Sequence, residues 1–102
     1  MQRRESRQIK HFSVPTQLYF HDDPQNRYTV LELIATDRPG LLSKVGQAFR
    51  KCGTRLYNAR ISTIGSRAED IFYITGADEH PLEGELEKRA LSDEILRLVG
   101  PR

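Results

Sequence analysis

The feature that most constrains the fold is a stretch of helical periodicity in the middle of the chain, residues 39–52. Apolar residues recur there at intervals of three and four, the spacing of one stripe along an amphipathic helix. They are Leu41, Leu42, Val45, Ala48, Phe49 and Cys52. Asp37 is expected to cap the start of this helix and Pro39 to take its first position. Gly53 suits a left-handed cap at its end.

Two segments that alternate with the period of a strand precede this helix, residues 12–20 and 28–36. Pro15 cannot donate to a strand ladder, which restricts the first segment to a sheet edge. Residues 21–26 are rich in turn formers and favour a hairpin between the two. The inward residues are expected to be Val14, Leu18, Phe20, Leu31, Leu33 and Ala35, with Val30 and Ile34 on the other face.

Two further strands are predicted after the helix, at residues 55–64 and 69–77. In the first, Leu56 has the opposite parity to Ala59 and Ile61, and a bulge near Tyr57–Asn58 would bring all three to the core side. In the second, Phe72 and Ile74 share one face, and Ile71 and Tyr73 share the other.

A last helix is predicted over residues 83–99, with Gly100–Pro101 as its stop. Its stripe changes phase, so Ser92 is a candidate break. The stripe residues are Leu86, Ala90, Leu91, Ile95 and Leu98. The order ββαββα predicts an α+β fold of the ferredoxin-like type, a four-stranded antiparallel sheet with two helices on one face. The usual fourth strand after the last helix is missing, and the N-terminal strand is expected to occupy the vacant edge.

The length of 102 residues allows one domain, which we place at residues 12–100 behind a basic linker or tail at 1–11. One cysteine excludes an intrachain disulfide and a cysteine metal cluster. The longest apolar runs are only a few residues, so neither a membrane span nor a signal peptide is expected. A cytoplasmic setting is therefore predicted.

The basic charge of the chain belongs to its tail. Residues 1–11 hold four basic residues and one acidic residue, whereas the remainder holds 12 basic and 13 acidic residues. A linker from an upstream domain explains this tail more simply than nucleic-acid binding does, and no nucleic-acid partner is expected. The charged residues of segment 44–67 are all basic, and those of segment 78–94 are mainly acidic. This pattern indicates either a polarised docking surface or two solvated faces.

Catalytic patterns are scarce. His11, His21 and His80 lie in the tail and in loops without metal-ligand spacing, so solvated histidines are the simplest interpretation. Cys52 ends the apolar stripe, where packing in the core is favoured over a nucleophilic role. No catalytic residue and no metal ligand is predicted.

The segment Thr36–Leu42 joins a predicted strand to the predicted helix. Free backbone N–H groups and the positive end of the helix dipole meet there, which suits a carboxylate. Gly40 would let a ligand approach the backbone closely. The same residues also suit a plain helix cap, so both interpretations stay open.

The run D-R-P-G-L-L at residues 37–42 resembles the signature turn of ACT domains, small regulatory modules that bind amino acids. The run N-A-R-I-S-T-I-G at 58–65 and the run E-D-I-F-Y-I at 69–74 are similar to the second and third ACT strands. Over residues 7–98 the chain most resembles the C-terminal ACT domains of bacterial enzymes that uridylylate and deuridylylate the nitrogen signal protein PII.

The resemblance implies one domain of a larger enzyme that senses glutamine and partners the PII protein. Catalysis, with Mg and UTP, would lie in other domains, and no cofactor is expected here. The effector would lie between the turn and the second strand of a neighbouring ACT domain or a second copy. The amino-acid-binding residues so implied are Asp37, Arg38, Pro39, Gly40, Leu41, Leu42, Asn58, Ala59 and Arg60.

Within this set, the N–H groups of residues 40–42 would meet the α-carboxylate, and Asn58 would recognise an amino group or an amide. Leu41 is expected to pack in the core rather than touch the ligand. The alternative function is a structural module for domain pairing or dimerisation without a ligand. Its surface would be the second sheet face, with Val30, Ile34, Ile71 and Tyr73.

Overall fold

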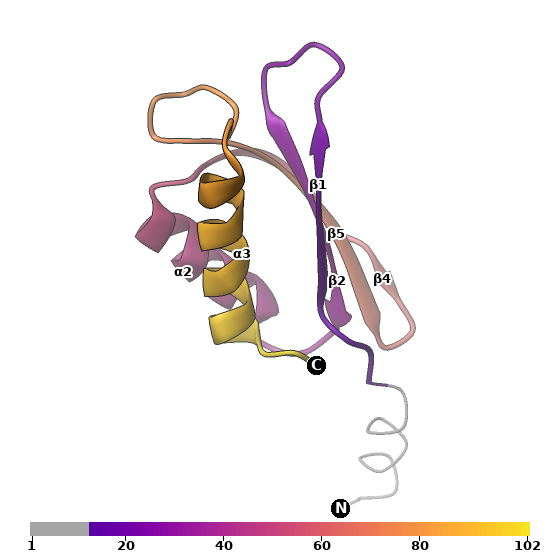
Figure 1. Ribbon diagram of the computed structural model, residues 1–102. Coiled ribbons are helices and arrows are strands. Elements are labelled where there is room, and N and C mark those ends of the chain that lie inside the picture. Colours follow the sequence, from indigo (N-terminus) through magenta and orange to yellow (C-terminus); the bar gives the residue numbers. More distant parts are fainter. Residues whose placement is uncertain (1–12) are drawn as a thin grey trace, which may run out of the picture.

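The computed structural model describes residues 13–102 and shows an antiparallel sheet with two helices packed on one face (Figure 1). The tail at 1–11 and the first residue of the predicted N-terminal strand lie outside the described residues. The elements are β1 (Gln17–Asp22), β2 (Thr29–Thr36), α2 (Leu41–Cys52), β3 (Arg55–Arg60), β4 (Thr63–Ile64), β5 (Arg67–Thr75) and α3 (Glu85–Val99). The α+β class and the placement of both helices on one face are as predicted.

The strands follow the order β1-β2-β5-β3, and every pair is antiparallel. The N-terminal strand pairs with β2 at the edge of the sheet, which confirms its predicted position. The segment predicted as one strand over 55–64 is divided in two. Its second part, β4, has two residues and pairs with β5 beside the Gly65–Ser66 turn. The sheet therefore has five strands rather than four.

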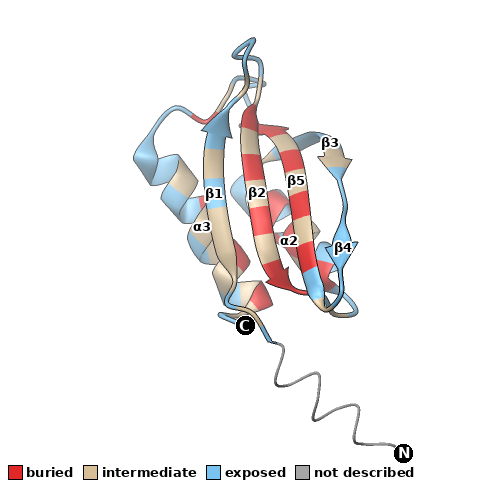
Figure 2. Cartoon of the chain, turned by 90° about the vertical axis from the view of Figure 1, so that its right-hand side faces the viewer, coloured by how far each residue is buried: buried red, intermediate tan, exposed pale blue. Residues whose placement is uncertain are grey.

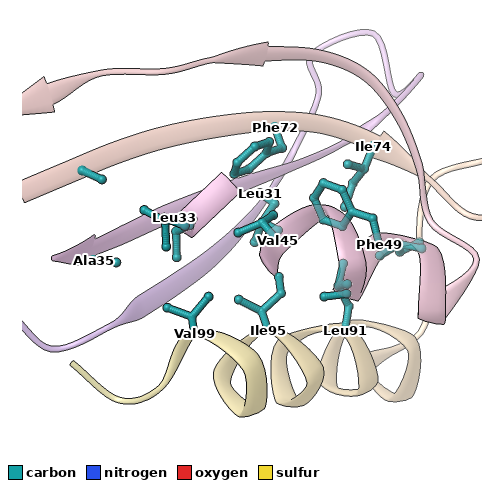
Figure 3. Close-up of a cluster of buried hydrophobic side chains, with 14 residues drawn as sticks. Leu31, Leu33, Ala35, Val45, Phe49, Phe72, Ile74, Leu91, Ile95 and Val99 are labelled. Carbon is teal, nitrogen blue, oxygen red and sulfur yellow. The ribbon is translucent and has the colours of Figure 1, made fainter. Parts of the chain in front are cut away.

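The core lies between the sheet and the helices. Leu31, Leu33 and Ala35 are fully buried on β2, as their alternation predicts, and Phe72 and Ile74 extend the same layer on β5. Figure 2 shows the buried residues concentrated on these two central strands. The helices contribute Val45, Phe49, Leu91, Ile95 and Val99, and their side chains converge on the sheet in Figure 3. Leu18 and Phe20 pack against the margin of this core.

The predicted bulge on the edge strand is present, because the pairing of β3 with β5 shifts register between Leu56 and Asn58. Leu56, Ala59 and Ile61 then line one shallow apolar groove beside α2. Leu56 is still 49% exposed and Ile61 51% exposed, so this edge of the core is open.

The start of α2 differs from the prediction. Gly40, not Asp37, is the N-cap residue, and no side chain caps the helix. Pro39 lies before the cap and not in the first turn. Gly40 adopts φ +83°, a left-handed conformation that glycine tolerates because it has no Cβ. At the other end Gly53 has φ +69°, as its position predicts.

The phase of α3 also differs from the prediction. The helix runs without a break through Ser92, and its buried stripe is Leu91, Ile95 and Val99. Leu86 is 83% exposed, because it does not share the helix face of Leu91, Ile95 and Val99. Cys52, predicted in the core, is exposed. It is the last residue of α2, and its sulfur lies 3.9 Å from the carbonyl oxygen of Ala90.

The charged segments of the sequence meet within the molecule. Lys51 on α2 lies 3.9 Å from Glu94 on α3, and Arg55 on β3 lies 3.9 Å from Glu79. The basic and acidic segments are thus partly paired with one another across the helices and loops. Exposed pairs of this kind contribute about 0–1 kcal/mol each, so their main effect is on surface charge rather than stability.

Candidate functional site

A cavity of about 200 Å³ lies where the turn before α2 faces the connection between β3 and β5. Its lining combines the turn and the first residues of α2 with residues from the sheet margin. These are Asp37, Arg38, Gly40, Leu41, Leu42 and Ser43, with Ile61, Thr63, Ala68 and Asp70. Five of the nine predicted site residues therefore gather at one cavity. We call it the turn cavity.

The first turn of α2 is short of hydrogen-bond partners. The Leu41 N–H donates to the Arg38 carbonyl at 3.3 Å, and the ladder begins with the Lys44 N–H on the Gly40 carbonyl at 3.0 Å. Helix geometry leaves the N–H groups of Leu42 and Ser43 without intrahelical acceptors. No side chain caps them, and the first turn has no acidic residue. The positive end of the helix dipole is thus uncompensated and suits an anionic group.

Arg38 fixes the turn against the C-terminal end of the fold. Its Nε donates to the Thr36 carbonyl at 3.4 Å, and its Nη1 donates to the Val99 carbonyl at 3.1 Å. Its Nη2 is buried and has no partner among residues 13–102. The guanidinium therefore serves first as a brace between the turn and α3, and it adds positive charge to the wall of the turn cavity.

Asp70 is a member of the turn cavity that the sequence prediction missed. It is 1% exposed, and its Oδ1 accepts a hydrogen bond from the Ser62 N–H at 3.1 Å. Burial raises the pKa of this carboxyl, and the nearby charge of Asp37 adds to the increase. Strand parity contains the signal, because Asp70 lies between Ala68 and Phe72 on the inward face of β5.

The remaining predicted site residues lie elsewhere in the molecule. Pro39 is exposed and does not line the turn cavity. Asn58 is exposed, and its Oδ1 accepts from the Ala59 N–H at 2.9 Å. Ala59 lines the apolar groove beside α2, and Arg60 lines a separate hollow with Glu32 and Glu69. One copy of the chain therefore does not bring residues 58–60 to the turn, and their role as ligand contacts stays a prediction.

The described residues provide little other chemistry. Within residues 13–102, no group of three or more His, Cys, Asp or Glu side chains could hold a metal ion. His21 lies 3.1 Å from Glu32 on the sheet, and His80 is in an exposed loop. None of the described helices is long and apolar enough to cross a membrane.

The fold and the turn cavity together define the class of this protein. It is a small α+β domain with an antiparallel sheet, two helices on one face, and a cavity where a strand leads into a helix. This architecture is compatible with the ferredoxin-like fold of ACT domains.

Comparison with known proteins identifies relatives of this chain by sequence. The chain is 64% identical over 95 residues to the bifunctional uridylyltransferase/uridylyl-removing enzyme of Methylococcus capsulatus, covering 93% of this chain and 11% of that enzyme. It is 46% identical over 97 residues to the enzyme of the same name in Pseudomonas syringae pv. syringae, covering 95% of this chain and 11% of that enzyme. The chain thus spans about 11% of the length of the curated relatives it matches and is similar to one segment of them. No protein-family model and no solved structure matches it.

Proposed function

We propose that this chain is an amino-acid-sensing ACT domain, with glutamine as its effector, that regulates a bifunctional uridylyltransferase/uridylyl-removing enzyme. The high identity to one segment of such enzymes supports the parent activity. The observation that carries the sensing function is the turn cavity, because an uncapped helix start lines it together with the D-R-P-G-L-L turn.

In this proposal the effector's α-carboxylate accepts hydrogen bonds from the free N–H groups at the start of α2. Gly40 permits this approach because its backbone carries no side chain, and an added Cβ there would meet nothing within 4 Å. Leu41 is 4% exposed and packs in the core, whereas Leu42 is 46% exposed; both line the turn cavity. Asn58 and Arg60, which are exposed on β3, would complete the site from a neighbouring ACT domain or a second copy.

The effect of binding would be exerted on the parent enzyme. That enzyme would attach uridylyl groups to the PII protein when glutamine is scarce and remove them when glutamine is plentiful. Its catalytic residues, with Mg and UTP, would belong to other segments. This chain would supply the sensor and no catalytic group.

Isothermal titration of the 102-residue chain with L-glutamine tests the sensing function. We expect saturable binding that Gly40→Val weakens, because a β-branched residue resists the left-handed conformation and fills the approach to the turn. Gly46→Ala is the matched control, since Gly46 lies inside α2 and away from the turn cavity. The enzyme that contains this segment should show the same ranking in its glutamine response. If Gly40→Val keeps both glutamine binding and the enzyme's glutamine response, the assigned site is contradicted.

A structural pairing module is the second candidate, and the open sheet face favours it. Val30, Ile34, Ile71 and Tyr73 are only half-buried on the face opposite the helices, which no described segment covers in Figure 1. Sedimentation of the chain over a range of concentrations tests this function. Dimerisation that glutamine leaves unchanged and that Ile34→Glu abolishes would favour pairing alone, whereas a monomer at high concentration would count against it.

A further inference from the structure

The least expected residue of the core is Asp70, a carboxylate at an inward position of a central strand. It is 1% exposed, and its inward neighbours on β5 are Ala68 and Phe72. A carboxylate in such surroundings is unfavourable unless it is hydrogen-bonded and paired with a positive charge. The hydrogen-bond donors and cations around its side chain therefore decide how well its charged form is stabilised.

The fold provides only part of what a buried carboxylate needs. Within residues 13–102, the Ser62 N–H is the one hydrogen-bond donor to its side chain, at 3.1 Å to Oδ1. No Lys, Arg or His nitrogen of those residues lies within ion-pair distance of it. Arg38, which lines the same cavity, is directed instead to the carbonyls of Thr36 and Val99. Burial accordingly raises the pKa of the Asp70 carboxyl.

Asp70, which has no ion-pair partner among the described residues, lines the turn cavity. Asp70 and the uncapped start of α2 line one cavity of about 200 Å³, a volume of roughly seven water molecules. One wall is thus the Asp70 carboxylate. The other presents N–H donors at the positive end of a helix, with Asp37 and Arg38 beside them. A small molecule with an anionic and a cationic group on neighbouring atoms matches both walls at once.

We propose that the Asp70 carboxylate accepts the α-ammonium group of the amino-acid effector, so that the turn cavity selects the zwitterion. This inference rests on the proposed sensing function and adds to it the residue that distinguishes an amino acid from a simple carboxylic acid. In the bound state the ammonium group supplies the ion-pair partner that Asp70 lacks among the described residues, and the carboxylate group meets the start of α2. The hydrogen bond from Ser62 holds the Asp70 side chain in place for this contact.

The test compares L-glutamine with its desamino analogue, 4-carbamoylbutanoate, by isothermal titration of the 102-residue chain. The wild-type chain should prefer glutamine. Asp70→Asn keeps an oxygen acceptor for the Ser62 N–H but loses the charge. It should weaken glutamine binding about 10- to 100-fold, the range for a charged hydrogen bond, and leave the analogue almost unaffected. Glu69→Gln is the matched control, because Glu69 lies on the other face of β5, beside Arg67, and should change neither affinity.

Every other outcome overturns either the role of Asp70 or the sensing function itself. If the wild-type chain binds both compounds equally, or if Asp70→Asn weakens both alike, the sensing function stands and the role of Asp70 is overturned. If neither the folded chain nor the enzyme that contains this segment binds glutamine or another standard amino acid, the sensing function fails and the role of Asp70 fails with it. Should Asp70→Asn not fold, carboxyl-carbon NMR of the wild-type chain decides: glutamine, but not the analogue, should lower the pKa of Asp70.

Discussion

Replacing Gly40 by alanine tests the left-handed turn on which the candidate site depends. Gly40 has φ +83° and ψ 0°, and a Cβ built there meets no atom within 4 Å. The cost of Gly40→Ala is therefore conformational rather than steric. A non-glycine residue in the left-handed region costs about 1–2 kcal/mol. Part of this cost is offset because alanine restricts the unfolded chain, by about 0.4–1 kcal/mol. We expect a net loss of about 1 kcal/mol in the free energy of unfolding.

The same chemical change at Gly46 should have the opposite sign. Gly46 lies within α2, and its added Cβ would meet only the flexible Arg50 side chain, with Nη1 at 3.7 Å. Alanine is favoured over glycine in a helix interior by about 0.5–1 kcal/mol. The two variants should therefore differ by about 2 kcal/mol, although each adds one methyl group to the same helix region.

Urea unfolding followed by far-ultraviolet circular dichroism measures both variants against the wild type. The midpoint should fall for Gly40→Ala and rise for Gly46→Ala, with equal slopes. Equal midpoints for wild type and Gly40→Ala would refute the left-handed cap. The N–H groups at the start of α2 would then have no defined direction, and the turn cavity would lack its anion-binding wall.

Three other predictions allow independent checks. Cys52 is exposed as a residue, but partial desolvation of its thiol, and then the charge of Glu94, raise the pKa of that thiol. Iodoacetamide at neutral pH should therefore alkylate it more slowly than free cysteine, and Glu94→Gln should raise the rate in a mass-spectrometric assay. A rate above that of free cysteine would contradict this. Because the native pKa of Asp70 is raised, its contribution to stability is present in acid and lost as the pH rises through that pKa. Asp70→Asn cannot ionise, so it should gain stability relative to wild type between acid and neutral pH in urea titrations, and a pH-independent difference would count against this. Leu91→Ala should cost about 2–5 kcal/mol and Leu86→Ala below about 0.5 kcal/mol, because Leu91 is 1% exposed and Leu86 83% exposed; equal losses would contradict the phase of α3.

The sequence by itself determined the elements whose pattern is local. Alternation on β2 and β5 identified the buried faces, since a strand side that packs on a core must be apolar at every second position. The parity conflict at Leu56 indicated the bulge that the register with β5 confirms. Gly53 was recognised because a helix that ends in a left-handed residue selects glycine. The hairpin to β2 predicted the place of the N-terminal strand at the sheet edge, which is confirmed, although Pro15 lies before β1 rather than within it.

Only the tertiary structure decided how the candidate site is assembled. Asp37 and Pro39 suit a helix start locally, but the backbone turns at Gly40 instead, where Arg38 braces the turn against the carbonyl of Val99, 61 residues away in sequence. Asp70 is ordinary as a charged residue near a strand end. Strand parity already places it on the face of Phe72, but only the packing of the sheet against α2 puts it at one cavity with the start of that helix. A cavity depends on contacts between residues far apart in the chain, and periodicity along the sequence carries no information about which of those residues meet.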